Sequence, residues 1–276
     1  MPQQNSRQPV GQHALLRLLV ACGLMLLPCL LRAEAWREES SKHFRVFYVD
    51  DAAFATAVVE WAEQYYTQIT LELGLNHVVK RDYAPWLWER RCRIYLYPSR
   101  DAYLHATGSP VWSGGMVNYR QRVVYSFMGV TSFLEKTLPH ELTHILFREY
   151  VGFDNARVPR WLDEGVAQYA EIGRREESLD LMRQGVAQGV YVPLEQLQRL
   201  PVNHVYAGVA QLFYSQAVSL VHFFLSQYGS QRFITFCSSL RDGYPIERAL
   251  GFATAGSVRS LGELEDAWRQ FIFRLP

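Results

Sequence analysis

The sequence predicts an α+β fold in which a small α/β lobe, residues 36–127, precedes a helical lobe, residues 128–276. Up to residue 127, short stretches alternate apolar and polar residues as half-buried strands do, so we expect a mixed sheet with an edge strand. From residue 128 onwards, apolar residues recur at spacings of three and four, which is typical of amphipathic helices. The motif HELTH at residues 140–144 lies near the start of this second half and carries two potential metal ligands.

Residues 1–35 have the organisation of an export signal. Arg17 is the last charge before the uncharged run 18–31, which is followed by the sequence AEA at residues 33–35. A run of 14 residues is short for about 30 Å of hydrocarbon, and AEA is typical of signal cleavage sites. We expect cleavage after Ala35, a periplasmic or secreted protein, and no membrane span in the mature chain. An uncleaved anchor and a lipoprotein signal at Cys22 are less favoured alternatives.

The mature chain has a nearly balanced charge. Removing 35 of the 276 residues leaves 241, which is enough for one domain with a sizeable core or for two small lobes. Without Arg7, Arg17, Arg32 and Glu34, the 28 basic and 27 acidic residues fall to 25 and 26. No basic block stands out, so we expect no nucleic acid as a partner. Cys92 and Cys237 remain, and one disulfide or two buried thiols are both consistent with the sequence.

The first lobe is predicted to start as strand, helix and strand. Apolar residues alternate within 41–50, which indicates a strand. A helix capped by Asp50 or Asp51 follows to about residue 73, where Gly74 ends it. A second strand is expected at residues 91–97.

A glycine-containing hairpin completes the lobe. Residues 111–119 form a turn-rich segment that leads into a strand, and residues 122–127 are its expected partner. Glycines let another backbone approach closely, which suits an exposed edge strand that pairs with an extended peptide. An ordinary hairpin explains the same residues equally well.

The second half is predicted to be helical throughout. Pro139 cannot donate within a helix, so either a new helix starts there or a longer helix over 131–150 kinks. A loop at residues 153–159 then reverses the chain into a helix at 160–171. The remaining helices are expected at 176–188, 194–200, 213–227, 230–240 and 260–273.

The HELTH motif predicts a metal site. In a helix, His140 and His144 share one face, so both imidazoles can reach one zinc ion at about 2.0–2.1 Å. Glu141 is turned about 100° from His140 and can flank the open side of the ion as a general base for a water molecule. Two histidines on the surface of a helix are the alternative explanation.

A third ligand decides between these explanations. A metzincin has Gly and His where this chain has Phe147 and Tyr150, so that class is excluded. Glu149, nine residues after His140, lies half a turn away from the ligand face. A carboxylate from the returning helix remains, and Glu164 follows His144 by 20 residues. Two imidazoles and one carboxylate leave an open position, as catalytic zinc sites require.

The sequence HELTH followed by PRWLDEGVAQYAE resembles the gluzincins, the thermolysin-like zinc peptidases, and most closely the peptidase MA-like domains of bacterial envelope proteins. The resemblance is strongest over residues 138–171. It implies a zincin-like fold, a Zn²⁺ cofactor and a peptide or protein substrate. It also implies that His140, His144 and Glu164 bind the metal and that Glu141 is the base.

One position departs from that family. Many gluzincins have an aspartate four residues after the ligand glutamate as hydrogen-bond acceptor for a ligand histidine, and here Gln168 stands there. An amide oxygen can accept the same bond but holds it less strongly. Asp163, next to Glu164, is the other candidate acceptor for a ligand histidine. Alternatively, Asp163 is simply a charged residue on the surface of the helix.

Peptide hydrolysis also needs a donor to the developing oxyanion. The resemblance favours Tyr214, whose ring could equally pack in the core. The other candidates are Tyr206, His204 and His222.

Two other functions fit the same residues. One is a zincin-like binding or scaffolding module of the cell envelope that lacks activity, and the other is a zinc hydrolase acting on a non-peptide amide. A purely structural zinc has no need of Glu141 and usually has a fourth protein ligand. The sequence therefore favours a zinc metallopeptidase.

Overall fold

The computed structural model describes residues 35–75, 86, 88–111, 113–129, 132–201 and 205–275. Residues 36–276 form one compact unit. The predicted export signal up to residue 34, and His204 among the predicted donors, lie outside the described residues.

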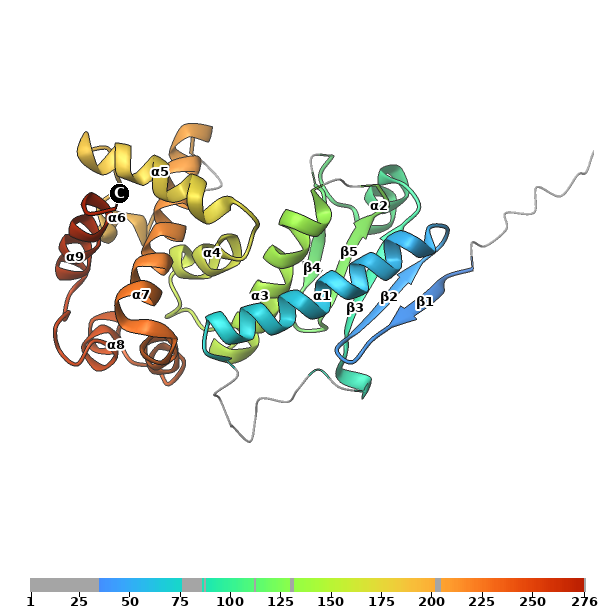
Figure 1. Ribbon diagram of the computed structural model, residues 1–276, viewed down its shortest axis with the longest axis horizontal. Coiled ribbons are helices and arrows are strands. Elements are labelled where there is room, and N and C mark those ends of the chain that lie inside the picture. The colour runs from blue at the N-terminus through green and yellow to red at the C-terminus, as the bar shows by residue number, and fades with distance from the viewer. Residues whose placement is uncertain are drawn as a thin grey trace, which may run out of the picture. The chain divides into compact units, whose positions relative to one another are not determined.

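A five-stranded mixed sheet forms the first part of this unit, in the order β1-β2-β3-β5-β4 (Figure 1). The inner pairs β2–β3 and β3–β5 are parallel, whereas β1 and β4 are antiparallel to their neighbours. The strands are β1 (Arg37–Ser40), β2 (Phe44–Tyr48), β3 (Cys92–Tyr97), β4 (Met116–Asn118) and β5 (Val123–Phe127). The mixed sheet is confirmed, and β4 lies at its edge as predicted.

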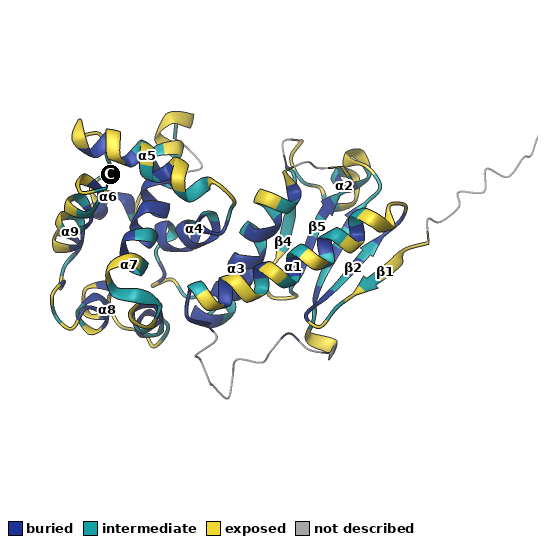
Figure 2. Ribbon diagram, viewed as in Figure 1, coloured by how far each residue is buried: buried dark blue, intermediate teal, exposed yellow. Residues whose placement is uncertain are grey.

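One helix packs along this sheet. In α1 (Ala52–Glu72), the side chain of Asp51 accepts a hydrogen bond of 2.9 Å from the backbone N–H of Phe54, as an N-cap should. Gly74 follows the helix at φ +75°, a conformation that glycine adopts without strain. Helix α1 packs on β1, β2 and α3. Figure 2 shows buried and exposed residues alternating along it.

The rest of the unit is helical. A π-helical turn, η3 (Phe133–Thr137), precedes α3 (Leu138–Val151), and Pro139 lies in the first turn of α3. Thr137, however, keeps helical angles (φ −63°, ψ −46°), so the π-helical turn runs into α3 without a break and the structure combines the two alternatives. The other helical elements are η2 (Trp88–Arg90), α2 (Arg100–Thr107), α4 (Arg160–Tyr169), α5 (Arg174–Ala187), α6 (Leu194–Leu197), α7 (Ala207–Arg241), α8 (Ile246–Ala253) and α9 (Leu261–Phe273).

The central helix of this part is α7, which contacts α4, α5 and α8. Gly229, at φ 76° and ψ 165°, interrupts it, so the two helices predicted at 213–227 and 230–240 are joined across a kink. By length and apolar composition α7 could span a membrane, but 56% of its apolar window is buried inside the unit. This burial is typical of a core helix.

The helices α4 and α7 cross closely at a glycine. A Cβ placed on Gly165 would lie 2.7 Å from the carbonyl oxygen of Ala217, which is too close for any side chain. This contact fixes α4 against the core. The two cysteines of this unit, Cys92 and Cys237, are both buried and free, so they do not pair.

Candidate metal centre

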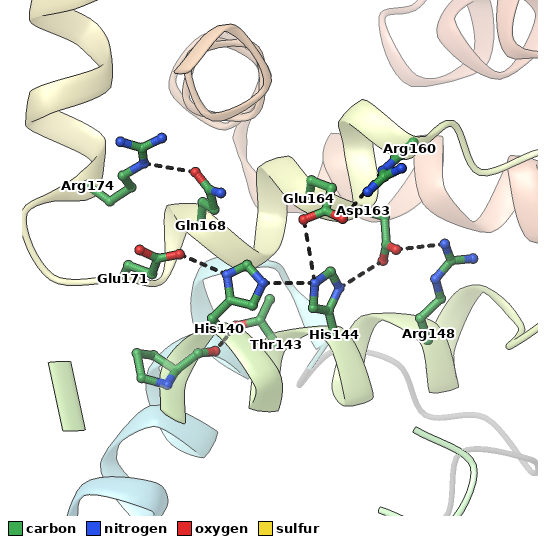
Figure 3. A network of polar contacts seen from close by, with 11 residues as sticks. His140, Thr143, His144, Arg148, Arg160, Asp163, Glu164, Gln168, Glu171 and Arg174 are labelled. Atoms are coloured by element: carbon green, nitrogen blue, oxygen red, sulfur yellow. Dashed lines mark hydrogen bonds and ion pairs between the residues drawn. The ribbon is translucent and has the colours of Figure 1, made fainter. Parts of the chain in front are cut away.

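Helices α3 and α4 bring three predicted ligands together. Ligand atoms of His140, His144 and Glu164 all lie within 4.8 Å of one another. The Nε2 atoms of the two histidines are 3.1 Å apart, and Oε2 of Glu164 is 3.9 Å from Nε2 of His144 (Figure 3). The four-residue spacing in α3 and the return of the chain into α4 together produce this cluster.

The opposite nitrogen of each imidazole faces a carboxylate. Nδ1 of His140 is 2.8 Å from Oε1 of Glu171, and Nδ1 of His144 is 3.3 Å from Oδ1 of Asp163. If Nδ1 donates to the carboxylate in both rings, each neutral imidazole presents the lone pair of its Nε2 to the other. Two such lone pairs at 3.1 Å repel one another, so a cation, either a metal ion or a proton on one ring, is needed to bridge them.

The cluster fits zinc. In a tetrahedral site with Zn–N bonds of about 2.0–2.1 Å, two ligand nitrogens are about 3.3–3.4 Å apart. The observed 3.1 Å between the two Nε2 atoms is close to that separation. Two imidazoles and one carboxylate are also a donor set that catalytic zinc sites use.

Charged neighbours hold the second histidine in place. Asp163 accepts a hydrogen bond of 2.7 Å from Arg148 in addition to its contact with His144. Burial works to raise the pKa of Asp163, but its contacts with His144 and Arg148 lower that pKa overall. Asp163 is therefore an ionised acceptor, and of the two alternatives the structure favours it over Gln168.

Gln168 has a different partner. Its amide oxygen accepts a hydrogen bond of 2.8 Å from Nε of Arg174. Glu171, which the sequence analysis missed, is the acceptor for His140 instead. Burial works to lower the pKa of His140, but the hydrogen bond with Glu171 and the nearby carboxylates raise it overall. Glu171 follows Glu164 by seven residues, close to two helical turns, and this spacing is the signal that could have identified it.

Glu141 borders a pocket next to the cluster. It lines this pocket of about 270 Å³ together with His140, Glu171 and the hairpin residues 113–115. Burial raises the pKa of Glu141, although the two neighbouring histidines act to lower it. The predicted base therefore has open space beside it in which a substrate could lie.

Only one of the predicted oxyanion donors lies near this cluster in the part of the chain that the structure describes. Tyr214 on α7 forms a hydrogen bond with Arg160, and Nε of Arg160 is 3.6 Å from Oε1 of Glu164. Tyr206 is 89% exposed at the start of α7. His222 is half-buried and packs against the rings of Tyr169 and Phe271, with ring centroids 6.1 and 5.8 Å away.

Sequence analysis missed a second tyrosine. The ring centroid of Tyr119, at the end of β4, lies 5.6 Å from that of His144. Tyr119 has no characteristic sequence spacing from the HELTH motif. Only the fold brings Tyr119 and His144 together.

One comparison with known proteins is informative. A family model described as the peptidase MA superfamily matches residues 88–274, which is more than half of the chain and includes the whole cluster. No curated protein matches the chain.

Proposed function

The chain belongs to the peptidase MA superfamily, and from this premise we propose that it is an exported zinc-dependent metallopeptidase. His140, His144 and Glu164 bind the metal, and Glu141 is the general base. The observation that carries the proposal is the pair of Nε2 atoms that face each other at 3.1 Å beside a carboxylate. Membership of the family supports a metallopeptidase-like module. The identity of the metal, of its ligands and of the general base is what we propose here.

Each residue has a defined task in peptide hydrolysis. His140, His144 and Glu164 would hold a zinc ion, which when bound would supply a Lewis acid for the scissile carbonyl and would lower the pKa of water to about 7. Glu141 takes a proton from the attacking water and returns it to the leaving amine. Glu171 and Asp163 keep the two imidazoles oriented. Tyr214, the donor favoured by the sequence analysis, stabilises the oxyanion by a hydrogen bond.

The exposed edge of the sheet is suited to binding an extended peptide as substrate. β4 pairs with β5 on one side and with no other described strand, so its outer backbone groups can bind a peptide as an added strand. A Cβ on Gly115 would lie 2.7 Å from Cγ2 of Thr137, so glycine lets the hairpin approach the start of α3 closely. This edge leads directly to the pocket of Glu141.

Metal analysis and turnover test the proposal together. We expect the purified protein to contain close to one zinc per chain and to cleave reduced, unfolded casein or a mixed peptide library. His140→Ala and Glu164→Gln should lose the zinc, as measured by mass spectrometry. Glu141→Gln should keep zinc and fold but lose turnover by a factor of at least about 10³, as expected for loss of a general base. Glu195→Gln, at an exposed position on α6, is the control.

Two outcomes contradict this function. A protein that binds zinc at the three ligands but cleaves none of the probes supports the binding or scaffolding module instead. If a mixed peptide library is untouched while small non-peptide amides are hydrolysed, the enzyme belongs to another substrate class.

Export has its own test. N-terminal sequencing of the protein from the cell envelope or medium should begin at Trp36. A chain that retains residue 1, or one that is lipidated at Cys22, contradicts cleavage after Ala35.

A further inference from the structure

Tyr119 stands beside the metal centre on the side of the sheet. It is the residue after β4, the strand proposed to pair with substrate. Its ring meets the imidazole of His144 edge to face, with centroids 5.6 Å apart and planes at 66°. The side chain remains 37% exposed, so it borders both the metal centre and the solvent from which a substrate enters.

The turn that carries Tyr119 is anchored to α3. Arg120 forms an ion pair with Asp154, just beyond the end of α3, and Arg122 forms one with Glu149 within α3. The pair of Arg122 and Glu149 is the one that holds the turn, because its side chains are 20% and 10% exposed, whereas those of Arg120 and Asp154 are 61% and 79% exposed. A side chain supported in this way is pre-organised, which a catalytic group requires.

The hydroxyl of Tyr119 is available as a donor. It makes no hydrogen bond with any residue that the structure describes. A phenolic hydroxyl has a pKa of about 10, so it keeps its proton at neutral pH and can donate.

We propose that Tyr119 is a catalytic residue whose hydroxyl donates a hydrogen bond to the carbonyl oxygen of the scissile peptide as negative charge develops on it. The inference rests on the proposed peptidase function. When the water oxygen bonds to the carbonyl carbon, the π electron pair moves to the carbonyl oxygen and the proton of the water moves to Glu141. Tyr119 keeps its own proton throughout and stabilises the charge by donation.

The two tyrosines near the site differ in how they are engaged. Tyr214 is already hydrogen-bonded to Arg160, whereas Tyr119 has no such partner among the described residues. Tyr119 also belongs to the hairpin that borders the substrate cleft. It therefore supplies a donor in addition to Tyr214, from a different part of the fold.

Tyr119→Phe removes only the hydroxyl and tests this role. We expect kcat on a cleaved peptide to fall by about 10²-fold or more, as for loss of one oxyanion donor, with KM and zinc content unchanged. The affinity for a phosphonamidate peptide, a tetrahedral analogue, should fall by a similar factor. Tyr125→Phe is the matched control, because Tyr125 lies on β5 and stacks on Tyr95 with centroids 5.5 Å apart.

Three results would overturn the inference. The first is turnover and phosphonamidate affinity in Tyr119→Phe within twofold of those in Tyr125→Phe. The second is a loss of zinc affinity that accounts for the lost activity, which would make Tyr119 a support for the metal. In both cases the unaltered protein cleaves peptide, so the proposed function stands. If the unaltered protein neither cleaves peptides nor binds the phosphonamidate, the proposed function fails and the role of Tyr119 fails with it.

Discussion

Oε1 of Glu171 lies 2.8 Å from Nδ1 of His140, and this contact leaves Nε2 of the ring facing the candidate metal centre. Glu171 lies just beyond the end of α4 (Figure 3). The position that many gluzincins use for the same purpose is occupied by Gln168, which binds Arg174 instead. The chain thus supplies the acceptor from a residue three positions further along.

We expect Glu171→Gln to lower the affinity for zinc by about 10- to 100-fold, as loss of a charged acceptor behind a ligand histidine does. Titration against a chelating competitor at constant pH measures the change. Gln168→Ala is the control and should bind zinc as the unaltered protein does. A larger loss in Gln168→Ala than in Glu171→Gln would show that the family position still supports His140.

Asp163→Ala should affect both the metal site and the stability of the fold. The substitution leaves the partly buried guanidinium of Arg148 without its 2.7 Å acceptor. We expect the free energy of unfolding of the zinc-free protein to fall by about 1–3 kcal/mol. Urea denaturation in the presence of a chelator measures it.

The double variant Asp163→Ala with Arg148→Met isolates the cause. Because methionine leaves no charge to be desolvated, the double variant should recover part of the lost stability. If the two substitutions are simply additive, the ion pair does not stabilise the fold.

The sequence predicted those elements whose signals are local. Asp51 caps α1 by accepting a hydrogen bond of 2.9 Å from the backbone N–H of Phe54. The helix period brings His140 and His144 together, and the edge strand follows from the glycine-containing hairpin. In each case the residues that determine the feature lie within a few positions of one another.

Other elements depend on distant contacts and were missed. The strand β1 has the sequence REES, which shows no apolar alternation, and it exists through its pairing with β2. The short helix α2 buries only Tyr103, so it shows no apolar period. By contrast, the equally short α8 buries Ile246, Ala249, Leu250 and Ala253 at helical spacing, so its signal was local and was overlooked. Tyr119 reaches His144 only because the sheet edge lies beside α3.

Glu63 should make the fold sensitive to acid. Burial works to raise the pKa of its carboxyl, but hydrogen bonds from Ser41 and from the ring and backbone N–H of His43 bring that pKa below the usual 4.5. A lowered folded pKa contributes stability that is present above pH 4.5 and is lost as the pH falls through the folded value. We therefore expect Glu63→Gln to be less stable than the unaltered protein at pH 7.

That stability difference should shrink as the pH falls below 4.5. Urea denaturation between about pH 3 and pH 8 measures it. Glu60→Gln, at an exposed position on the same helix, should give no comparable pH-dependent difference. A difference for Glu63→Gln that stays constant over the whole range would show that the charge of Glu63 contributes nothing.

Gly165→Ala should destabilise the crossing of α4 and α7 next to Glu164, the proposed third ligand. The added methyl group would meet the carbonyl oxygen of Ala217 at 2.7 Å and Cγ2 of Val221 at 3.0 Å, so one helix must shift. We expect the free energy of unfolding to fall by about 1–3 kcal/mol, which outweighs the gain of up to about 1 kcal/mol that alanine brings to a helix. Gly251→Ala in α8 is the matched control, because its methyl group would meet nothing within 4 Å and should stabilise the helix. Equal stabilisation by both substitutions in urea denaturation would show that α4 is not held by this contact.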